Sequence, residues 1–551
     1  MALFLGFLCV VVVGRLAELQ LFEHGRWAAA AQAMQERTIE LTPRRGTIYD
    51  RKGVALAFDV KAVAIAIDSF NMTRPETLVK ILCEELGTSA RTLEPLVYRP
   101  SYFTWINRKV DLETAHAIEK RAKEAGSYGL IFMDTWKRCY PQGALASNLI
   151  GFVGLDGRGL EGFELAYDAY LGGDPATLQV VQGADGRTYH TETSDKGLPG
   201  QDLRLTIDSR LQLLCEEEID RGVATFKANA GFIVLLDPEN GDVLAMAQNR
   251  RYDLNHFQAS TAAARKNLAV NFLFEPGSAF KAITGLAALD CGAVRPEDRF
   301  NGNDGVTLYG HTIHNSENKS YGTVSFGEVI EQSINTGMIR AAQKLGEERM
   351  YRYLVDFGFG QKTGITLPGE EKGILTDVVD WSGLSLASTA IGQSVAVTGI
   401  QLARAMAVVA NGGLLVAPRA VRAPAPGDEA GDAPAPKRVA SESSCGEMRA
   451  LLRRVVAQGT GTLAEVKGFA VAGKTGTAQK ALPGRGYADG KYTSLFAGFL
   501  PGERPEYVLL VVLDEVKTTP IWGGYTAGQI FHGAASRIAA LEHLAPVAAA
   551  R

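Results

Sequence analysis

An uncharged apolar run at the N-terminus sets the first limit on how this chain can fold. The run is ALFLGFLCVVVVG, Ala2 to Gly14, and Arg15 and Glu18 then begin an amphipathic continuation. A helix that spans a bilayer needs about 20 apolar residues, whereas a run of roughly 10 to 14 equally fits a signal-peptide core or a buried helix. No basic segment precedes the run and no A-x-A-like site directly follows it, which disfavours a cleaved signal. We expect an uncleaved membrane anchor over residues 1–22, with its cytoplasmic tail missing from this chain and the other residues beyond the membrane.

The rest of the chain has the composition of a folded globular protein. Its 551 residues are 46% hydrophobic and 21% charged, and this length is too great for one core, so we expect two or more domains. Lys and Arg number 57 against 61 Asp and Glu, a formal charge of -4, so we expect no nucleic-acid partner. The six cysteines are scattered without a CxxC pair, which favours buried single thiols over a zinc site or a disulfide framework.

Two regions of different pattern follow the apolar run. In residues 23–200, β-rich runs alternate with turn signals and helical patterns, which predicts an α+β module. Residues 201–551 begin with a helical pattern, LTIDSRLQLLCEEEIDRGVATF, followed by a hairpin pattern, AGFIVLLDPENGDVLAMA. Further helical patterns follow, and strand-like runs return at FAVAGKTGT, LFAGFL and YVLLVVLD. Strands at both ends predict an α+β domain whose single sheet is built from both ends. The Pro/Ala/Gly/Asp-rich stretch from Arg422 is expected to be a solvated loop.

The segment FEPGSAFKAIT, Phe274 to Thr284, places a serine and a lysine three residues apart. The preceding Pro-Gly marks a turn, so we expect Ser278 near a helix N-terminus, with Lys281 one turn further on the same side. The helix is apolar nearly all round, which predicts that it is buried together with its lysine. Burial lowers the pKa of a lysine, as a general base for a serine hydroxyl requires. The pattern is weak, since it recurs at Ser316–Lys319 without an apolar helix, and an N-cap serine with a snorkelling lysine is the alternative.

Two further polar motifs could complete such a site. In Ser333-Ile334-Asn335, both polar side chains are expected to face a cleft from a turn between helices, the serine relaying a proton and the asparagine donating to a substrate carbonyl or to Lys281. In Lys474-Thr475-Gly476-Thr477, on an expected edge strand, the lysine and hydroxyls would hold a carboxylate and Gly476 would let backbone approach substrate closely. We expect the similar triplets Ser69–Asn71, Ser316–Asn318 and Lys362–Gly364 to be ordinary turns and loops.

These motifs resemble those of the penicillin-recognising serine D,D-transpeptidases, which are S-x-x-K, S-x-N and K-[ST]-G in this order. Blocks similar to the transpeptidase domain of class B penicillin-binding proteins are FEPGSAFK, FGFGQKTGITLPGE, IGQSVAVTGIQLARAMAVVANGG, VAQGTGT and VAGKTGTAQK. Blocks similar to that class's non-catalytic N-terminal module are RRGTIYDRKG, RCYPQGALASNLIGFVG and GLEGFELAYDAYL. The resemblance covers nearly the whole chain. It implies an antiparallel sheet flanked by helices with an all-helical part, preceded by an elongated α+β pedestal and an anchor.

The resemblance also implies a function. The protein would be a single-pass enzyme of the bacterial inner membrane, with a periplasmic catalytic domain that cross-links peptidoglycan stem peptides. Ser278 would attack the D-Ala-D-Ala bond, expel the terminal D-Ala and pass the acyl group to an amine on a neighbouring strand. β-Lactams would acylate the same serine, and neither a metal nor another cofactor is implied. The implied roles are activation of Ser278 by Lys281, proton shuttling by Ser333, donor orientation by Asn335, carboxylate binding by Lys474, Thr475 and Thr477, and an oxyanion hole from the N–H groups of Ser278 and Thr477.

The branch of the family and its partners follow from the same resemblance. Total length, the lack of a C-terminal extension and GGYTAGQIF near the end are more similar to the septal, cell-division branch than to the elongation or sporulation branches. The implied partners are a membrane-embedded glycan polymerase and other division-complex proteins. Two features depart from the family: the anchor is short without a basic tail, and Gly399 stands where the family often has Pro in a V-T-P-L-Q block.

Several alternatives stay open. An elongation- or sporulation-specific transpeptidase would carry the same motifs. A β-lactamase or D,D-carboxypeptidase would use water in place of the amine, although no Glu-x-x-Leu-Asn-type element supplies a lactamase base. An α/β-hydrolase would need a G-x-S-x-G elbow; the nearest match is Gly392-Gln-Ser394, whose serine is expected to be a helix cap. A catalytically idle division scaffold is disfavoured by the intact motifs. His311 and His314, on a predicted hairpin, lack a third ligand in register, so no metal site is expected.

Overall fold

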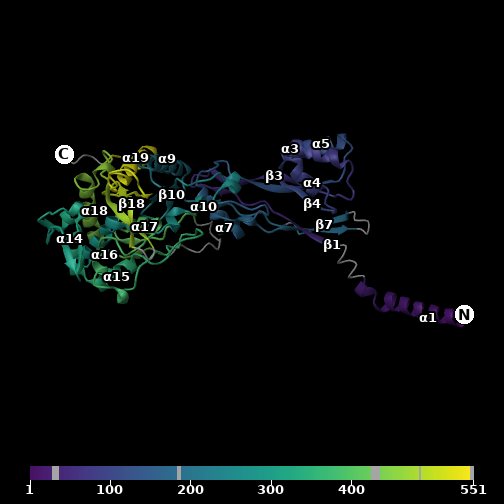
Figure 1. The fold of residues 1–551 in the computed structure, drawn as a ribbon, viewed down its shortest axis with the longest axis horizontal. Coiled ribbons are helices and arrows are strands. Elements are labelled where there is room, and N and C mark those ends of the chain that lie inside the picture. Colours follow the sequence, from purple (N-terminus) through teal and green to yellow (C-terminus); the bar gives the residue numbers. More distant parts are fainter. Residues whose placement is uncertain (28–35, 183–187, 196, 423–434, 483–485, 547–551) are drawn as a thin grey trace.

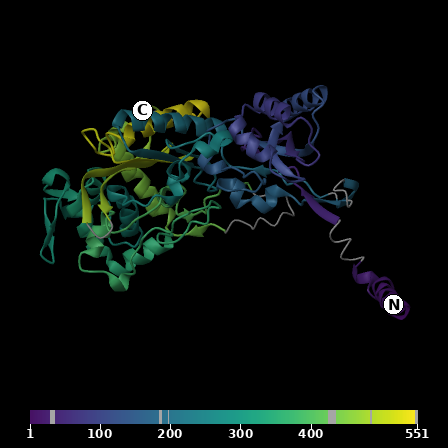
Figure 2. The same cartoon turned by 45° about the vertical axis from the view of Figure 1, so that its right-hand side comes forward.

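The molecule is elongated, with three parts in chain order. The computed structural model describes residues 1–27, 36–182, 188–195, 197–422, 435–482 and 486–546. Figure 1 shows the N-terminal helix apart from the rest, an N-terminal module, and a larger C-terminal domain at the opposite end, and Figure 2 shows the same order. This arrangement is the elongated α+β pedestal and catalytic-type domain that the sequence predicts. Most of the stretch predicted to be a solvated loop, residues 423–434, lies outside the described residues.

The N-terminal apolar run forms a helix long enough to cross a membrane. Helix α1 (Ala2–Ala17) continues into a π-helical turn, η1 (Glu18–Phe22). Together Leu3–Phe22 make a 20-residue segment of mean hydropathy 1.9, none of it buried against the rest of the chain. The amphipathic continuation therefore supplies the turns that the uncharged run alone lacks, and the helix reaches the length of about 20 residues that a bilayer requires.

The N-terminal module is built on two antiparallel-rich sheets. The long strand β3 pairs along its length with β5, from Phe58 opposite Cys139 to Ile67 opposite Leu130. Three amphipathic helices cover one end of this sheet and bury Leu78, Leu82 and Ile118 between them and the strands. The elements of the first sheet are β2 (Ile48–Tyr49), β3 (Ala55–Ile67), β4 (Thr104–Asp111), β5 (Leu130–Cys139) and β8 (Leu203–Arg204). The second sheet has β1 (Glu36–Leu41), β6 (Ala176–Gln182) and β7 (Thr188–Asp195); the helices are α3 (Pro75–Leu86), α4 (Ala90–Val97), α5 (Leu112–Glu124), α6 (Ser147–Ile150), α7 (Gly162–Ala166) and α8 (Asp168–Gly172).

The C-terminal domain has one large sheet built from both of its ends, as the sequence predicts. The described residues of this domain also form three two-stranded sheets, of which the sequence predicts only the hairpin around the two histidines. The strand order of the large sheet is β10-β9-β19-β18-β17, all antiparallel, so that β17 is the edge strand. The hairpin of β9 and β10 pairs through β9 with the C-terminal strand β19. The strands are β9 (Ala230–Leu236), β10 (Val243–Gln248), β17 (Ala472–Leu482), β18 (Gly486–Leu500) and β19 (Tyr507–Asp514).

Helices cover both faces of this sheet, which explains why its central strands are apolar at nearly every position. Ile233 and Leu235 of β9 pack toward α9 (Ser209–Phe226) and α19 (Ala527–Leu541), whereas Phe232 and Val234 pack on the opposite face. Figure 1 shows α9 and α19 on one side of the sheet and α17 on the other. The helical part on that second side contains α12 (Lys281–Asp290), α13 (Phe326–Glu331), α14 (Asn335–Leu345), α15 (Glu347–Asp356), α16 (Ser385–Ala390), α17 (Gly399–Ala410) and α18 (Glu442–Ala457).

Short elements complete the domain. The predicted hairpin around the two histidines is present as β12 (Val306–Leu308) and β13 (His311–Ile313). The remaining strands are β11 (Arg299–Asn301), β14 (Thr323–Ser325), β15 (Leu414–Leu415) and β16 (Lys437–Arg438). The remaining helices are η2 (Leu254–Ala259), α10 (Ala262–Arg265), α11 (Leu268–Asn271), η3 (Gly277–Phe280), η4 (Ser316–Asn318), η5 (Val378–Asp380) and η6 (Thr462–Ala464).

Candidate active site

The serine of the FEPGSAFKAIT segment, Ser278, lies at the start of a buried helix. Ser278 is the second residue of the 3-10 helix η3, which leads directly into α12. The first N–H groups of a helix have no partner within it, so the backbone at Ser278 can donate to a ligand. Ser278 is half-buried, whereas Ala279, Phe280 and the following turns of α12 are buried. The helix is therefore enclosed as the sequence predicts, with the serine at its accessible end.

Lys281 is completely buried, and its hydrogen bonds within the described part of the chain all go to the turn that carries Ser333 and Asn335. Its side chain is 0% exposed. Nζ donates to the Ser333 carbonyl oxygen at 2.6 Å and to Asn335 Oδ1 at 2.6 Å, and Ser333 Oγ lies 3.3 Å away. The two short contacts are to acceptor-only oxygens, so a neutral amine would use both of its N–H bonds there. Its lone pair would then be left for a hydroxyl group.

The Ser333-Ile334-Asn335 motif forms the predicted turn between helices. It connects α13 to α14, and Ser333 has a left-handed backbone with φ of 59°. Ile334 is buried between the two polar residues and fixes the turn to the core. Ser333 and Asn335 are half-buried. This geometry turns the Ser333 carbonyl and the Asn335 amide toward Lys281.

Lys474 reaches the same region from the edge strand β17. Lys474 lies two residues after Ala472, which belongs to the core on the helical side of the sheet, so strand alternation directs its side chain toward that side. Lys474 is 0% exposed, and its Nζ lies 3.4 Å from Thr475 Oγ1. Thr475 also shares a hydrogen bond of 3.1 Å with Thr460 Oγ1, and Thr477 Oγ1 accepts from the Gly523 N–H at 2.8 Å. The hydroxyl of Thr477 therefore keeps its own proton for a ligand.

Glycines allow the backbones of η3 and β17 to touch. A Cβ at Gly476 would lie 2.6 Å from the Pro276 carbonyl oxygen, and a Cβ at Gly277, where φ is 51°, would lie 2.8 Å from the Thr477 carbonyl oxygen. We expected Gly476 to let the backbone approach substrate; the structure shows that it first lets β17 approach the segment of the nucleophile. The N–H groups of Ser278 and Thr477 belong to these two touching segments.

Burial changes the protonation of both lysines. Burial, reinforced by the positive charge of Lys474, holds the pKa of Lys281 well below its usual range. Burial alone lowers the pKa of Lys474 to about 7. Within the described residues, neither lysine has a carboxylate at hydrogen-bond or ion-pair distance. Lys281 can therefore be neutral and basic at neutral pH, while Lys474 is poised between its charged and neutral forms.

Two contacts of the site were not predicted from the sequence. The first is the carbonyl oxygen of His314, which accepts from Asn335 Nδ2 at 2.7 Å. This bond orients the amide so that Oδ1 faces Lys281, and it leaves one N–H of Nδ2 free for a substrate carbonyl. A backbone carbonyl has no sequence signal, so only the predicted hairpin around His314 could have suggested it.

The second is Glu275, three residues before Ser278. Its Oε1 accepts from the Ser394 N–H at 2.9 Å and from Tyr487 Oη at 3.4 Å, while Oε2 is buried without a hydrogen-bond partner. Burial raises the pKa of this carboxyl group. Glu275 thereby joins the nucleophile segment to the loop before α17 and to the β17–β18 hairpin. In the sequence, the feature that could have indicated this residue is an acidic side chain within an otherwise apolar segment.

The triplets elsewhere in the chain that are similar to the site motifs form turns and loops, as expected. The expectation for Ser394, in contrast, needs a correction. Ser316–Asn318 is an exposed 3-10 turn, and the Thr363 hydroxyl donates to Glu370 Oε1. In the described residues, no group of three or more His, Cys, Asp or Glu side chains could hold a metal ion. The expectation that Ser394 caps a helix is wrong: Thr398 caps α17 through Gln401, and Ser394 lies in the loop before it with φ of 57°.

A serine at a helix start and two buried lysines with lowered pKa values lie close together in this domain, an arrangement of the kind that acyl transfer requires. The chain belongs to the family of penicillin-binding proteins with a transpeptidase domain: residues 231–535 match the penicillin-binding protein transpeptidase domain, and residues 40–205 match the penicillin-binding protein dimerisation domain. Its fold is that of the class B proteins of this family.

Particular relatives span nearly the whole chain. Stage V sporulation protein D of Bacillus subtilis is 32% identical over 540 residues, covering 95% of this chain and 82% of that protein. Peptidoglycan D,D-transpeptidase FtsI of Escherichia coli is 29% identical over 530 residues, covering 94% of this chain and 87% of that protein. A crystal structure of penicillin-binding protein 3 from Mycobacterium tuberculosis with aztreonam superposes with a TM-score of 0.70 and 28% identity, covering 92% of this chain and 98% of that one.

Proposed function

We propose that this protein is a peptidoglycan D,D-transpeptidase that acts through a Ser278 acyl-enzyme during septal cell-wall synthesis. The observation that carries the proposal is the position of Lys281. Its amine is buried, its pKa is lowered, and its two short contacts are to carbonyl oxygens that can only accept. A lysine held in this way can take a proton from a serine hydroxyl, and Ser278 precedes it by one helical turn.

The first half-reaction makes the acyl-enzyme. Ser278 Oγ attacks the carbonyl carbon of the penultimate D-Ala, and its proton passes to Lys281 Nζ. The N–H groups of Ser278 and Thr477 stabilise the oxyanion. The C–N bond then breaks, and the departing D-Ala amine takes a proton from Lys281 through the hydroxyl of Ser333, which lies 3.3 Å from Nζ. The products are an ester on Ser278 and free D-Ala.

The second half-reaction transfers the acyl group. An amine of a neighbouring stem peptide attacks the ester carbonyl and loses a proton to Lys281. The ester C–O bond breaks, Ser278 Oγ takes that proton back, and a new amide remains. Asn335 holds the donor through its free N–H during both steps, and Lys474, Thr475 and Thr477 bind the donor carboxylate at the start.

The proposed division of the chain is a membrane anchor over residues 1–22, a pedestal over 23–200 and a transpeptidase domain over 201–551. The apolar helix Leu3–Phe22 supports the anchor. The large domain would lie in the periplasm, where stem peptides are, and the pedestal would set its distance from the membrane. A membrane-embedded glycan polymerase and other division proteins are the proposed partners.

A transfer assay with purified full-length protein tests the proposed reaction. The donor is a stem pentapeptide ending in D-Ala-D-Ala, the acceptor is a second stem peptide with a free amine, and mass spectrometry follows D-Ala release and the cross-linked product. We expect both products from the native protein and neither from Ser278→Ala. Release of D-Ala without cross-linked product would instead support a D,D-carboxypeptidase.

The septal role needs a test in cells, because the relatives carry different roles in their names. FtsI of Escherichia coli and stage V sporulation protein D of Bacillus subtilis have similar identity to this chain. Depletion in the native bacterium should give filaments that lack septa. Round cells would point to elongation, and a defect confined to spores would point to sporulation.

A further inference from the structure

A second polar site lies far along the chain from Ser278, where the N-terminal module meets the C-terminal domain. A cavity of about 190 Å³ opens there between strands β3, β4 and β5 of the module and the helix η2 of the C-terminal domain. The two parts are joined beside it by Asn255, whose side chain accepts from the Tyr140 N–H at 3.0 Å and donates to the Tyr140 carbonyl oxygen at 2.9 Å. The cavity is therefore part of a fixed junction.

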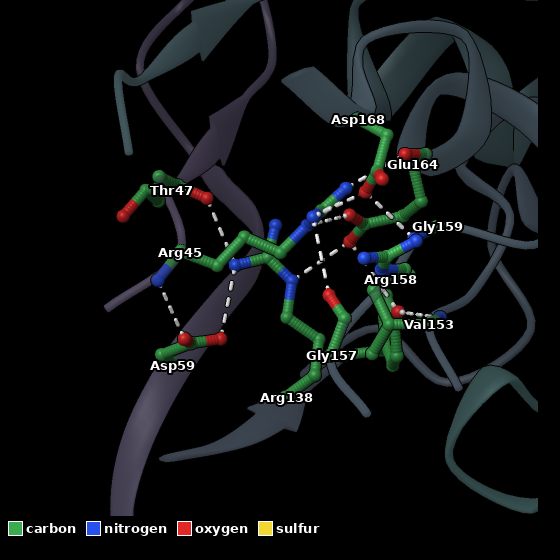
Figure 3. Close-up of polar contacts among 12 residues, drawn as sticks. Arg45, Thr47, Asp59, Arg138, Val153, Gly157, Arg158, Gly159, Glu164 and Asp168 are labelled. Atoms are coloured by element: carbon green, nitrogen blue, oxygen red, sulfur yellow. Dashed lines mark hydrogen bonds and ion pairs between the residues drawn. The ribbon is translucent and has the colours of Figure 1, made fainter. Parts of the chain in front are cut away.

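One wall of the cavity is a buried ionic network. Figure 3 shows the guanidinium groups of Arg45 and Arg138 between Asp59 on one side and Glu164 and Asp168 on the other. Arg45 Nε donates to Glu164 Oε2 at 2.6 Å and its Nη1 donates to Asp168 Oδ1 at 2.7 Å. Arg138 Nε donates to Glu164 Oε1 at 2.7 Å. These carboxylates are already bound by cations and backbone N–H groups.

Arg138 keeps a donor that nothing in the described residues satisfies. Its side chain is only 3% exposed, and its Nη1 donates to the Gly46 carbonyl oxygen at 2.8 Å and to Asp59 Oδ1 at 3.2 Å. Its Nη2 is buried and has no hydrogen-bond partner. Leaving a buried charged donor unpaired is costly. Nη2 is itself closed off from the cavity, so Arg138 contributes positive charge beside the cavity and not a direct contact to an occupant.

Lys109 supplies a second incomplete cation at the cavity. Its Nζ donates to the Trp136 carbonyl oxygen at 2.6 Å, and no carboxylate of the described residues lies within ion-pair distance of it. Burial lowers the pKa of its ammonium group. An ammonium has three N–H donors, so two remain for an occupant of the cavity.

The rest of the lining decides what the occupant can be. Leu254 and Phe257 of η2 line the cavity with apolar surface, whereas Lys109 and Arg138 line it from the N-terminal module. An occupant must therefore offer oxygen acceptors at one end and a short apolar group at the other, and about 190 Å³ limits it to a small molecule. We propose that this junction cavity binds a small organic carboxylate, with its oxygens on Lys109 Nζ beside the Arg138 guanidinium and its alkyl group against Leu254 and Phe257.

Such a ligand would contact both parts of the molecule at once. Arg138 and Lys109 belong to the N-terminal module, whereas Leu254 and Phe257 belong to the C-terminal domain. A molecule bound only by this joined arrangement stabilises it by mass action, so its concentration would tune how firmly the transpeptidase domain is held on its pedestal. This role is separate from the chemistry at Ser278.

Saturation-transfer NMR on the full-length protein in detergent tests the site with three probes: propionate, inorganic phosphate and ethylammonium. We expect transfer to the methyl group of propionate with millimolar affinity, which suits so small a ligand, and none to ethylammonium. Lys109→Met should weaken propionate binding roughly tenfold or more, because a charge-assisted hydrogen bond is lost. Lys109→Arg should retain it, and Lys123→Met, an equal charge change on the exposed face of α5, should not alter it.

A chemical protection experiment on the native sequence removes any dependence on variant folding. Propionate should slow acetylation of Lys109 by an activated ester, but not that of Lys123, as mapped by mass spectrometry. The proposal is overturned if propionate neither binds nor protects Lys109, if Lys109→Met and the native protein bind it equally, or if phosphate or ethylammonium binds more tightly. Penicillin labelling at equal rates in all variants verifies that they are folded.

Discussion

At the scale of single residues, the proposed site contains two buried lysines that have no carboxylate partner among the residues that the structure describes. Lys281 is held by the Ser333 carbonyl and the Asn335 amide, while Lys474 has only long contacts, 3.4 Å and 3.5 Å, to Thr475. Burying an ammonium opposes folding. It also lowers the pKa of the amine, which can then act as a base or as an anion-binding group whose charge depends on pH. The roles that we propose for these residues would therefore come at the expense of stability.

Replacing Lys474 by methionine should make the protein more stable and inactive. Lys474→Met keeps the volume of the side chain and removes a buried charge, which should stabilise the fold by about 1–4 kcal/mol. The folded-state pKa of Lys474 is about 7. The unfolded chain binds the extra proton between this value and about 10.4, so the stability of the native protein rises with pH over that window. Calorimetric Tm values should show the largest gain for Lys474→Met at or below pH 7 and a smaller gain as the pH rises. An equal or lower Tm at pH 7 would contradict this.

The rate of acylation should depend on pH through the same two lysines. A neutral Lys281 is needed to take the serine proton, so the rate rises with pH at the acidic side. A charged Lys474 is needed to bind a carboxylate, so the rate falls as the pH passes about 7. Stopped-flow measurements of the acylation rate by a penicillin between about pH 5 and pH 9 should therefore give a bell-shaped pH–rate profile. The methyl ester of the same penicillin lacks the carboxylate and should lose the falling limb; the same fall with both compounds would remove Lys474 from this role.

At the scale of elements, the site exists because η3 and β17 touch. Residue spacing predicts the nucleophile helix, the turn between α13 and α14, and the edge strand, because apolar periodicity and turn residues specify each of them locally. The contacts that bring these three elements together, in contrast, are not specified by local stretches of sequence. The contact between Pro276 and Gly476, and the bond from Asn335 to the His314 carbonyl, join segments far apart in the chain through backbone atoms that every residue type has.

Adding one methyl group at the contact should disable the site. Gly476→Ala places a Cβ 2.6 Å from the Pro276 carbonyl oxygen, so β17 must move away from η3. We expect acylation by penicillin to fall at least about tenfold, since small misplacements of catalytic groups are costly. Gly446→Ala on α18 is the matched control, because its nearest neighbour is the Arg449 side chain at 3.8 Å. Equal acylation rates for the two variants would show that the contact does not matter.

At the scale of the whole molecule, the chain has three parts in order, and we propose a separate task for each. The sequence predicts the anchor, the module and the catalytic-type domain from their patterns and from the family blocks. It did not predict the junction cavity, because the cations of that cavity lie on β4 and β5 and its apolar wall lies on η2, more than a hundred residues further along. Nor did it predict the buried network of Arg45, Arg138 and Glu164, although three of the quoted blocks contain one residue of it each.

Removing the N-terminal helix should release the protein from the membrane fraction without changing its acylation by penicillin. Deletion of residues 1–27 removes the apolar helix, which makes no buried contact with the rest of the chain. We expect the shortened protein to move from the membrane pellet to the soluble fraction after ultracentrifugation, and to be acylated by penicillin at the native rate. A shortened protein that stays in the pellet while folded would show a second membrane-binding surface.

The central claim is that Ser278 is the acylated nucleophile of this protein, and one measurement tests it directly. The purified full-length protein is incubated with a fluorescent penicillin, digested, and the adduct located by mass spectrometry, with Ser278→Ala and Ser316→Ala treated in parallel. We predict a single long-lived adduct on Ser278, retained in Ser316→Ala and absent from Ser278→Ala. An adduct on another residue, or a folded native protein that takes no label, would contradict the account.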